Sequence, residues 1–194
     1  MKKLLLTCLF GLASTAHTGH AAGSMLPDIE QVIAQCAPNV APTTMMAIIK
    51  VESGGNPLAI NVNGKKRLAR QPASIFEAVA WASWLIDKGY SVDLGLAQVN
   101  SQHLSRLGLP TEAMFQPCFN IAAGAQILTE NYANATKKFG SGQAALRAAI
   151  SAYNTGNHSA GFTNGYVRKV SAAASKWPAK TAADASPMLV SSTP

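Results

Sequence analysis

Apolar residues recur at helical spacing along almost the whole chain, and this pattern limits the possible folds more than any other feature of the sequence. The alternation of apolar and polar residues that marks a half-buried strand is scarce, and alanine, the best helix former, is abundant. The chain has 194 residues, enough for one domain with a sizeable core. The sequence therefore predicts a mainly α-helical single domain.

Glycines, prolines and capping residues divide this helical pattern into segments. The expected helices cover residues 26–35, 42–53, 75–88, 101–107, 119–140, 143–153 and 166–176. Ser74, followed three residues later by Glu77, predicts a capping box at the start of the third. Residues 56–73 are expected to form a loop containing a small β-hairpin, because Asn63-Gly64 is a favoured two-residue hairpin turn. Residues 93–98 are expected to form a tight loop or to begin a short helix.

The two ends of the chain have compositions unlike the middle. Residues 1–21 carry Lys2 and Lys3, then an apolar run and small residues up to a cleavage position after Ala21, which is typical of a secretory signal peptide. The apolar run is too short to cross a membrane as a permanent anchor, although an N-terminal anchor is the alternative interpretation. Residues 177–194 are small, polar and proline-containing, so a disordered tail is expected. The folded domain is thus predicted to span residues 22–176.

The net charge and the cysteine content indicate which partners and which cellular compartment to expect. The formal net charge is +7, and only residues 65–67 form a basic cluster, which is simply explained as a solvated loop, so no nucleic-acid partner is expected. Cys36 and Cys118 remain after the leader is removed, and an exported pair favours one disulfide over two free buried thiols. The histidines His103 and His158 lack the spacing of metal ligands, so neither a metal nor another cofactor is expected.

The stretch KVESGGNP at residues 50–57 places a carboxylate at the end of an apolar helix. The negative end of the helix dipole and burial beside Ile49 and Val51 both disfavour the anion, so the pKa of Glu52 is expected to be raised. A carboxyl group with a raised pKa suits a general acid that works near neutral pH. Gly54 and Gly55 could end the helix and leave room for a bulky ligand. A simple helix end explains the same residues, so this motif alone is ambiguous.

Two further motifs carry polar side chains suited to sugars. GLAQVN at residues 95–100 places the amides of Gln98 and Asn100 on a tight backbone, and amides both donate to and accept from sugar hydroxyl and N-acetyl groups. AYNTGN at residues 152–157 places Tyr153 and Asn154 at a helix end. A capped turn explains the first motif and a packed tyrosine with a capping asparagine explains the second, so each alternative stays open.

Taken together, these motifs resemble a known family. The ordered set ES (52–53), GLAQVN (95–100), NIAAGAQIL (120–128) and AYNTGN (152–157) is similar to the soluble lytic transglycosylase family, which has a lysozyme-like fold. The segments CAPNVAP, DLGLAQVNS and FQPCFNI look like the VirB1-type branch of type IV secretion and conjugation systems. The resemblance covers about residues 26–170 and implies a lysozyme-like single domain.

The resemblance also implies a role for each motif. Glu52 would be the sole acid and base, and Ser53 would contact the substrate or hold Glu52. Gln98 and Asn100 would bind sugars, and Tyr153 and Asn154 would pack beside Glu52. Asn120 would cap the helix that follows it, and Gly124 would allow close helix packing. Ala97 stands where many relatives carry a bulkier residue, which puts the detailed sugar preference in doubt.

The implied activity is cleavage of peptidoglycan glycan strands in the periplasm, with release of 1,6-anhydromuramyl products. The implied partners are that polymer and the envelope components of a type IV secretion or conjugation apparatus, with no membrane span once the leader is removed. Two alternatives remain. A hydrolytic muramidase would need a second carboxylate, for which Asp93 is the candidate because it adjoins a motif. A non-catalytic peptidoglycan-binding scaffold would need no acid at all.

Overall fold

The computed structural model describes residues 28–177. Within that range the chain forms eight α-helices, two short 3-10 helices and one three-stranded antiparallel sheet. The predicted mainly helical class is therefore confirmed. The predicted signal peptide (residues 1–21) and, apart from Trp177, the predicted tail (residues 177–194) lie outside the described residues and stay predictions.

The elements follow one another along the chain in a fixed order. The α-helices are α1 (Ile29–Cys36), α2 (Pro42–Glu52), α3 (Ile75–Asp87), α4 (Leu104–Leu107), α5 (Pro117–Phe139), α6 (Gln143–Thr155), α7 (Ala160–Thr163) and α8 (Tyr166–Ser175). The 3-10 helices are η1 (Ser101–His103) and η2 (Thr111–Phe115), and the strands are β1 (Ile60–Val62), β2 (Val92–Leu94) and β3 (Val99–Asn100).

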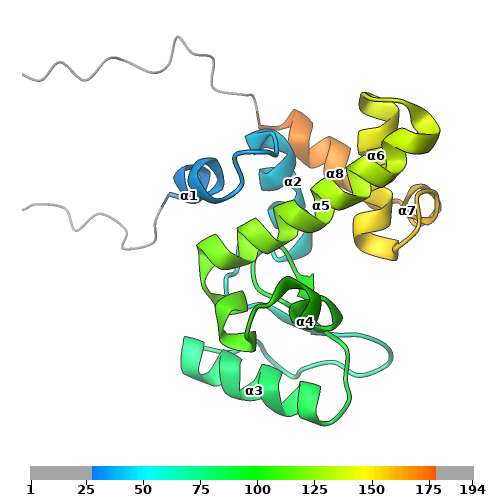
Figure 1. Cartoon of the computed structure of the whole chain (residues 1–194). Helices are drawn as coiled ribbons and strands as arrows, with labels where there is room; N and C mark the ends of the chain where they lie inside the picture. The colour runs from blue at the N-terminus through cyan, green and yellow to red at the C-terminus, as the bar shows by residue number, and fades with distance from the viewer. Residues whose placement is uncertain (1–27, 178–194) are drawn as a thin grey trace, which may run out of the picture.

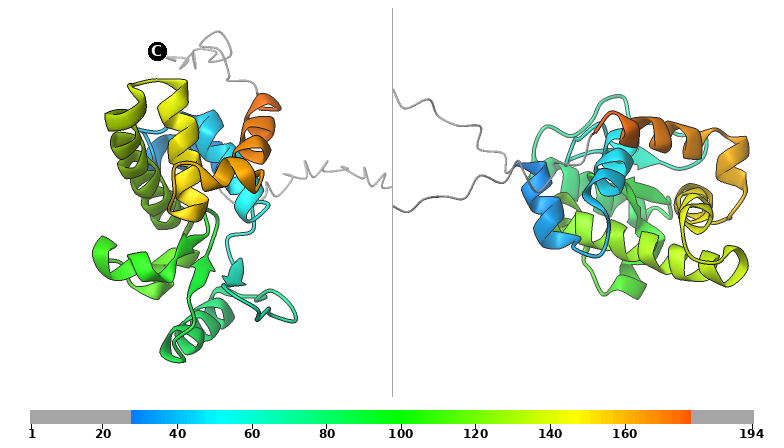
Figure 2. Two further views of the ribbon diagram at one scale, coloured as in Figure 1. Left: turned by 90° about the vertical axis from the view of Figure 1, so that its right-hand side faces the viewer. Right: turned by 90° about the horizontal axis from the view of Figure 1, so that it is seen from above.

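The long helix α5 crosses the molecule and links two groups of elements (Figure 1). At one end of the molecule lies a group of packed helices, α1, α2, α6, α7 and α8. At the other end of the molecule lie α3, α4 and the small sheet (Figure 2). One continuous apolar core joins the two groups, with fully buried members such as Ile48 of α2, Leu94 of β2 and Ile121 of α5. Burial of this core fixes the distance between the helical group and the sheet.

The predicted hairpin within residues 56–73 is wrong. β1 pairs instead with β2, placing Ile60 opposite Leu94, and residues 63–73 form a loop without a strand. The side chain of Gln71 covers the free edge of β1: its amide oxygen accepts from the Ile60 N–H at 2.8 Å and its amide nitrogen donates to the Ile60 carbonyl at 3.1 Å. Because this amide satisfies the edge groups that a hairpin partner would have bonded, no second local strand is needed.

The Ser74 cap is confirmed, with one difference. The Ser74 hydroxyl accepts a hydrogen bond from the Glu77 N–H at 3.2 Å, as a capping box requires. The Glu77 carboxylate, however, accepts from the N–H of Ala73 at 2.7 Å and pairs with Arg70. In a capping box the Glu77 side chain would accept from the N–H of Ser74 itself. Here it accepts from the residue before the cap, which ties the end of the loop to α3.

The predicted disulfide is also confirmed. Cys36, the last residue of α1, is bonded to Cys118 in the first turn of α5, with 5.4 Å between the two Cα atoms and a sequence separation of 82. This bond is a covalent tie that holds α1 against α5.

Replacing both Cys36 and Cys118 by serine is expected to lower the free energy of unfolding by about 4 kcal/mol, because a closed loop of this length restricts the unfolded chain. Urea unfolding of the protein without residues 1–21, the predicted leader, measures the change. The wild-type protein under reductant is the matched control and should unfold with the double variant. An unchanged midpoint in both samples would show that the crosslink contributes nothing to stability.

Candidate active site

Helix α2 carries Glu52 to the edge of the core. Glu52 is its last residue, and Ile48 and Ile49, one turn earlier, are 0 % and 1 % exposed. Residues three and four apart lie on the same face of a helix, so the face that buries these isoleucines also carries the carboxyl group. The apolar residues that make α2 a core helix thereby force a carboxyl group into partly buried surroundings.

The turn after Glu52 explains the rest of the motif. The Ser53 hydroxyl donates to the Ile49 carbonyl at 3.2 Å and accepts from the Gly55 N–H at 3.1 Å, which closes the end of the helix. Gly54 and Gly55 have φ values of 65° and 92°, in the region that glycine adopts at little cost. Neither glycine lines the pocket beside Glu52. The two glycines are therefore required by backbone conformation rather than by room for a ligand.

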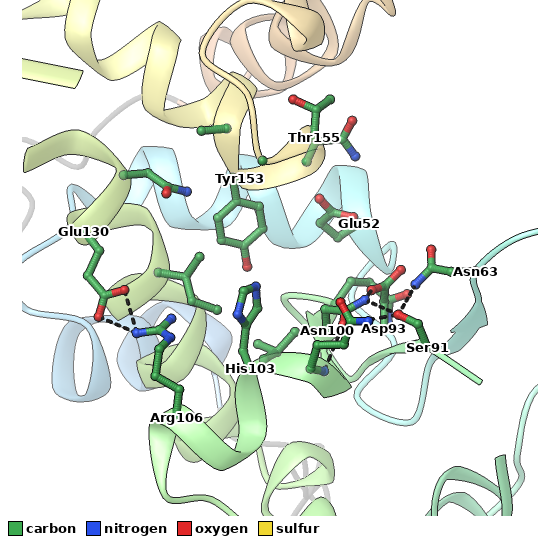
Figure 3. Close-up of a pocket in the computed structure, with 18 residues that line it drawn as sticks. Glu52, Asn63, Ser91, Asp93, Asn100, His103, Arg106, Glu130, Tyr153 and Thr155 are labelled. Atoms are coloured by element: carbon green, nitrogen blue, oxygen red, sulfur yellow. Dashed lines mark hydrogen bonds and ion pairs between the residues drawn. The ribbon is translucent and has the colours of Figure 1, made fainter. Parts of the chain in front are cut away.

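The Glu52 side chain lines a pocket of about 450 Å³ between the helical group and the sheet (Figure 3). Helices α2 and α6 form one wall, the sheet with η1 and α4 forms another, and α5 forms the back. The lining residues used below are Glu52, Asp93, Gln98, Asn100, His103, Arg106, Glu130, Tyr153 and Asn154. Most of these side chains are polar, as a site for a hydrated polymer requires.

Burial dominates the electrostatics of Glu52. Loss of water around the carboxyl raises its pKa to about 7, and the negative charge of Asp93 acts in the same direction. A hydrogen bond donated by the Tyr166 hydroxyl to Glu52 Oε1 lowers the pKa and partly offsets these effects. The upward direction expected from burial is confirmed. Near neutral pH the group can therefore both release and accept a proton.

Sequence reasoning missed Tyr166. It is the first residue of α8, 114 residues after Glu52, and it is 6 % exposed. A tyrosine that opens an amphipathic helix has the same sequence pattern as an ordinary core residue, so no local signal distinguishes it. Packing of α8 against α2 is what brings its hydroxyl to the carboxyl group.

Asp93 faces the same pocket from the middle strand of the sheet. Its Oδ1 accepts from Asn100 on β3 at 2.7 Å, and its Oδ2 accepts from Asn61 on β1 at 3.1 Å. Asn100 also caps η1, because its side-chain oxygen accepts from the Gln102 N–H at 2.9 Å. Both oxygens of Asp93 are thus held by amides from the neighbouring strands, which fixes a second carboxylate in the cleft.

The turn between β2 and β3 is built from the GLAQ motif. Gly95 has a φ of 71°, and a Cβ atom there would lie 2.2 Å from the Met114 carbonyl oxygen, so both conformation and space demand glycine. Gln98 is the non-glycine residue with positive φ, at 49°, in the described range. Its amide nitrogen donates to the carbonyls of Gly95 at 2.8 Å and Ala59 at 3.2 Å. Gln98 therefore fixes the turn as well as lining the pocket.

Asn120 does not cap α5 as expected. It is 1 % exposed, donates to the carbonyls of Leu94 and Met114 at 2.8 and 2.9 Å, and accepts from the Ala97 N–H at 2.7 Å. The turn bends back over α5, so its backbone groups are buried and need a partner, which this one amide supplies. The cap position belongs to Gln116 instead.

Tyr153 connects α6 to the same turn. Its hydroxyl donates to the Ala97 carbonyl at 2.7 Å, and burial of that hydroxyl raises its pKa, as does the nearby Glu52 charge. Gly124 of α5 makes this contact possible, because a Cβ there would lie 2.7 Å from the Ala97 Cβ and 2.9 Å from the Tyr153 hydroxyl oxygen. The close packing expected at Gly124 is confirmed.

The structure brings most of the predicted site residues together. Glu52, Gln98, Asn100, Tyr153 and Asn154 all line the pocket. Asn154 also accepts a hydrogen bond from the side chain of Asn164 at 3.0 Å, which ties the end of α6 to the end of α7. Ser53 does not line the pocket and serves the helix end.

Two further properties of residues 28–177 bear on the type of site. No group of three or more His, Cys, Asp or Glu side chains in this range is placed to hold a metal ion. No helix in the same range is both long enough and apolar enough to cross a membrane.

Comparison with known proteins identifies the family. Residues 32–175 match the model of the transglycosylase SLT domain. The chain belongs to the transglycosylase SLT domain family. The match begins in α1 and ends at the last residue of α8, so it includes the whole pocket. No solved structure gives a significant match to the chain.

The curated relatives of this family member are VirB1 proteins. It is similar to the type IV secretion system protein virB1 of Brucella suis biovar 1, at 48 % identity over 146 residues, which is 72 % of this chain and 61 % of the relative. Protein virB1 of Agrobacterium fabrum strain C58 is 39 % identical over 165 residues, or 84 % of this chain and 66 % of the relative. Protein virB1 of Rhizobium radiobacter is 42 % identical over 149 residues, or 76 % and 61 %. The chain thus spans just under two thirds of these relatives.

Replacing Glu52 by glutamine is expected to make the protein more stable, and increasingly so as the pH rises. Between pH 4.5 and about 7 the folded protein keeps a proton on Glu52 that the unfolded chain has lost, so wild-type stability falls across this interval. The advantage of the glutamine variant should grow to at most about 3 kcal/mol above pH 7. Urea unfolding of both proteins between pH 4 and pH 8 measures it. A difference that does not change with pH would contradict the raised pKa.

Replacing Tyr166 by phenylalanine is expected to raise the pKa of Glu52 further, because the hydroxyl favours the ionised carboxylate. NMR titration of the Glu52 side-chain carboxyl measures the change. Tyr153→Phe is the matched control, since its hydroxyl bonds to the Ala97 carbonyl and not to Glu52. If the two variants shifted the pKa equally, or if Tyr166→Phe lowered it, the assigned role of Tyr166 would be wrong.

Proposed function

We propose that the protein is an exported peptidoglycan lytic transglycosylase that cleaves the β-1,4 bond between N-acetylmuramic acid and N-acetylglucosamine. The observation that carries this proposal is the partly buried carboxyl of Glu52, with a pKa of about 7, at the edge of a long polar pocket. Membership of the transglycosylase SLT domain family supports the same reaction.

In the first half of the proposed reaction Glu52 is the general acid. The protonated carboxyl donates its proton to the glycosidic oxygen, and the bond from that oxygen to the anomeric carbon of the muramyl residue breaks. The N-acetylglucosamine side leaves with a free hydroxyl group. Positive charge develops on the muramyl ring, and the fixed carboxylate of Asp93 in the same pocket favours it electrostatically.

In the second half the carboxylate of Glu52 is the base. It removes the proton from the muramyl 6-hydroxyl group while that oxygen bonds to the anomeric carbon, so the product is a 1,6-anhydro sugar and no water is consumed. The same proton count is restored on Glu52, which is ready for another cycle. A pKa near 7 suits both halves, since neither protonation state is strongly favoured at neutral pH.

The remaining predicted residues receive roles from their positions in the pocket. Gln98 and Asn100 line the sheet wall, and Tyr153 and Asn154 line the α6 wall, so we assign all four to the sugar subsites. Ser53 is assigned to support Glu52, because its hydroxyl closes the helix end directly beneath the acid.

We further propose that the enzyme acts in the periplasm and opens the wall locally for a type IV secretion or conjugation apparatus. The relatives named type IV secretion system protein virB1 support this role, and the predicted signal peptide supports export.

Mass spectrometry of peptidoglycan digested by the protein lacking its leader tests the reaction, with Glu52→Gln in parallel. We expect 1,6-anhydromuropeptides from the wild type and a loss of at least about 100-fold in the variant, which keeps the shape of the side chain but cannot donate or accept the proton in turn. Products with reducing ends would instead indicate a hydrolase, with Asp93 as its second carboxylate. Wall binding without cleavage by either protein would indicate a scaffold.

A further inference from the structure

An ion pair at the end of the pocket away from Asp93 is not used by the proposed reaction. Arg106 of α4 donates from its Nη1 to both carboxylate oxygens of Glu130 on α5, at 2.9 and 2.8 Å (Figure 3). Gln126, one turn earlier on α5, holds Glu130 in place by donating to its Oε1 at 3.0 Å. The guanidinium group is therefore positioned from the back wall of the cleft.

This pair leaves one edge of the guanidinium group free. An arginine side chain has five N–H donors, and the contacts to Glu130 use those of Nη1 alone. Within residues 28–177 nothing accepts a hydrogen bond from Nε or Nη2 of Arg106, although the side chain lines the pocket and is 47 % exposed. The Nε and Nη2 donors point in the parallel arrangement that binds both oxygens of a carboxylate.

We infer that Arg106 is a specificity residue that binds, through its Nε–Nη2 edge, a carboxylate of the peptide stem on a muramyl residue lying in the cleft. The inference rests on the proposed function, since it is the lactyl ether of N-acetylmuramic acid that attaches such peptides to the strand. A sugar hydroxyl group would engage only one of the donors, whereas a peptide carboxylate engages both in two charge-assisted hydrogen bonds.

Neighbouring charges fit this assignment. Burial lowers the pKa of His103, as does the adjacent Arg106 charge, while the charges of Glu130 and Asp93 partly offset this, so the neutral imidazole beside the arginine is favoured over the cation. Asp93 lies toward the other end of the pocket, where Glu52 stands, and its negative charge is separated from the Arg106 end by the His103 side chain (Figure 3). Among the described residues that line the pocket, Arg106 is the one lysine or arginine side chain, and Glu130 already pairs with its charge, so a second carboxylate would be bound through the free Nε and Nη2 donors.

The consequence is a preference for strands that still carry peptides. Bidentate binding of a carboxylate by arginine is among the stronger hydrogen-bonded contacts, so its loss should cost roughly 10- to 100-fold in kcat/KM. The enzyme would then cut wall that has not been stripped by amidases in preference to bare glycan.

The test compares two substrates on the same protein. Release of anhydro products is measured from peptide-bearing glycan strands and from the same strands after an amidase has removed the peptides. We expect wild type to prefer the peptide-bearing strands, and we expect Arg106→Gln to reduce the ratio of the two kcat/KM values at least roughly 10-fold. Arg106→Lys keeps the charge but not the two-donor edge, so its ratio should fall between that of wild type and that of Arg106→Gln.

The ratio separates recognition from folding, because a misfolded variant loses both activities together. The matched control is Arg168→Gln on α8, an exposed arginine outside the pocket, which should keep the wild-type ratio. If wild type and Arg106→Gln gave the same ratio of kcat/KM on the two substrates, the inference would be overturned and the proposed function would stand. If wild type released anhydro products from neither substrate, the proposed function and the inference would both fall.

Discussion

The contact between Glu52 and Tyr166 is the constraint on which the rest of the site depends. A carboxyl group at the end of a core helix loses most of its water, and burial raises its pKa to about 7. The Tyr166 hydroxyl is the group that compensates for the lost water, because it donates to one carboxylate oxygen. Tyr166 comes from α8, so the acid is completed only when the last helix packs against α2. The protonation state of Glu52 is in this way coupled to closure of the whole domain.

The opposite wall of the cleft depends on buried polar contacts in the same manner. The side chain of Asn120 satisfies three backbone groups of β2, the following turn and η2, and Tyr153 satisfies the Ala97 carbonyl from α6. A buried turn with unpaired backbone groups would be costly, so these two side chains determine where the turn lies. Because the turn is fixed to α5 and α6, the strands on either side of it hold Asp93 and Asn100 in the same pocket as Glu52.

Much of this architecture was predictable because it follows from local rules. Helical spacing predicted the class and most helix bounds, Ser74 predicted a cap, and the two cysteines that follow the predicted signal peptide predicted their bond. The hairpin expected at Asn63-Gly64 was wrong, because a turn signal says nothing about which strand lies nearby: Gln71 covers one edge of β1, and β2, 30 residues later, takes the other. Asn120 was given a capping role for the same reason, since its sequence position alone could not show the buried turn above it.

The sequence by itself determined the helical class and the carboxyl at the end of α2, because these depend on residue spacing within single segments. It also determined the family, because the resemblance depends on short motifs and their order along the chain. Only the tertiary structure decided that Tyr166 bonds to Glu52, that Asn61 and Asn100 hold Asp93, and that Arg106 pairs with Glu130 in the lining of the cleft. Each of these contacts joins residues on different elements. The physical reason is that burial and hydrogen bonding act between surfaces that meet only after the core has formed, so no local pattern encodes the pairing.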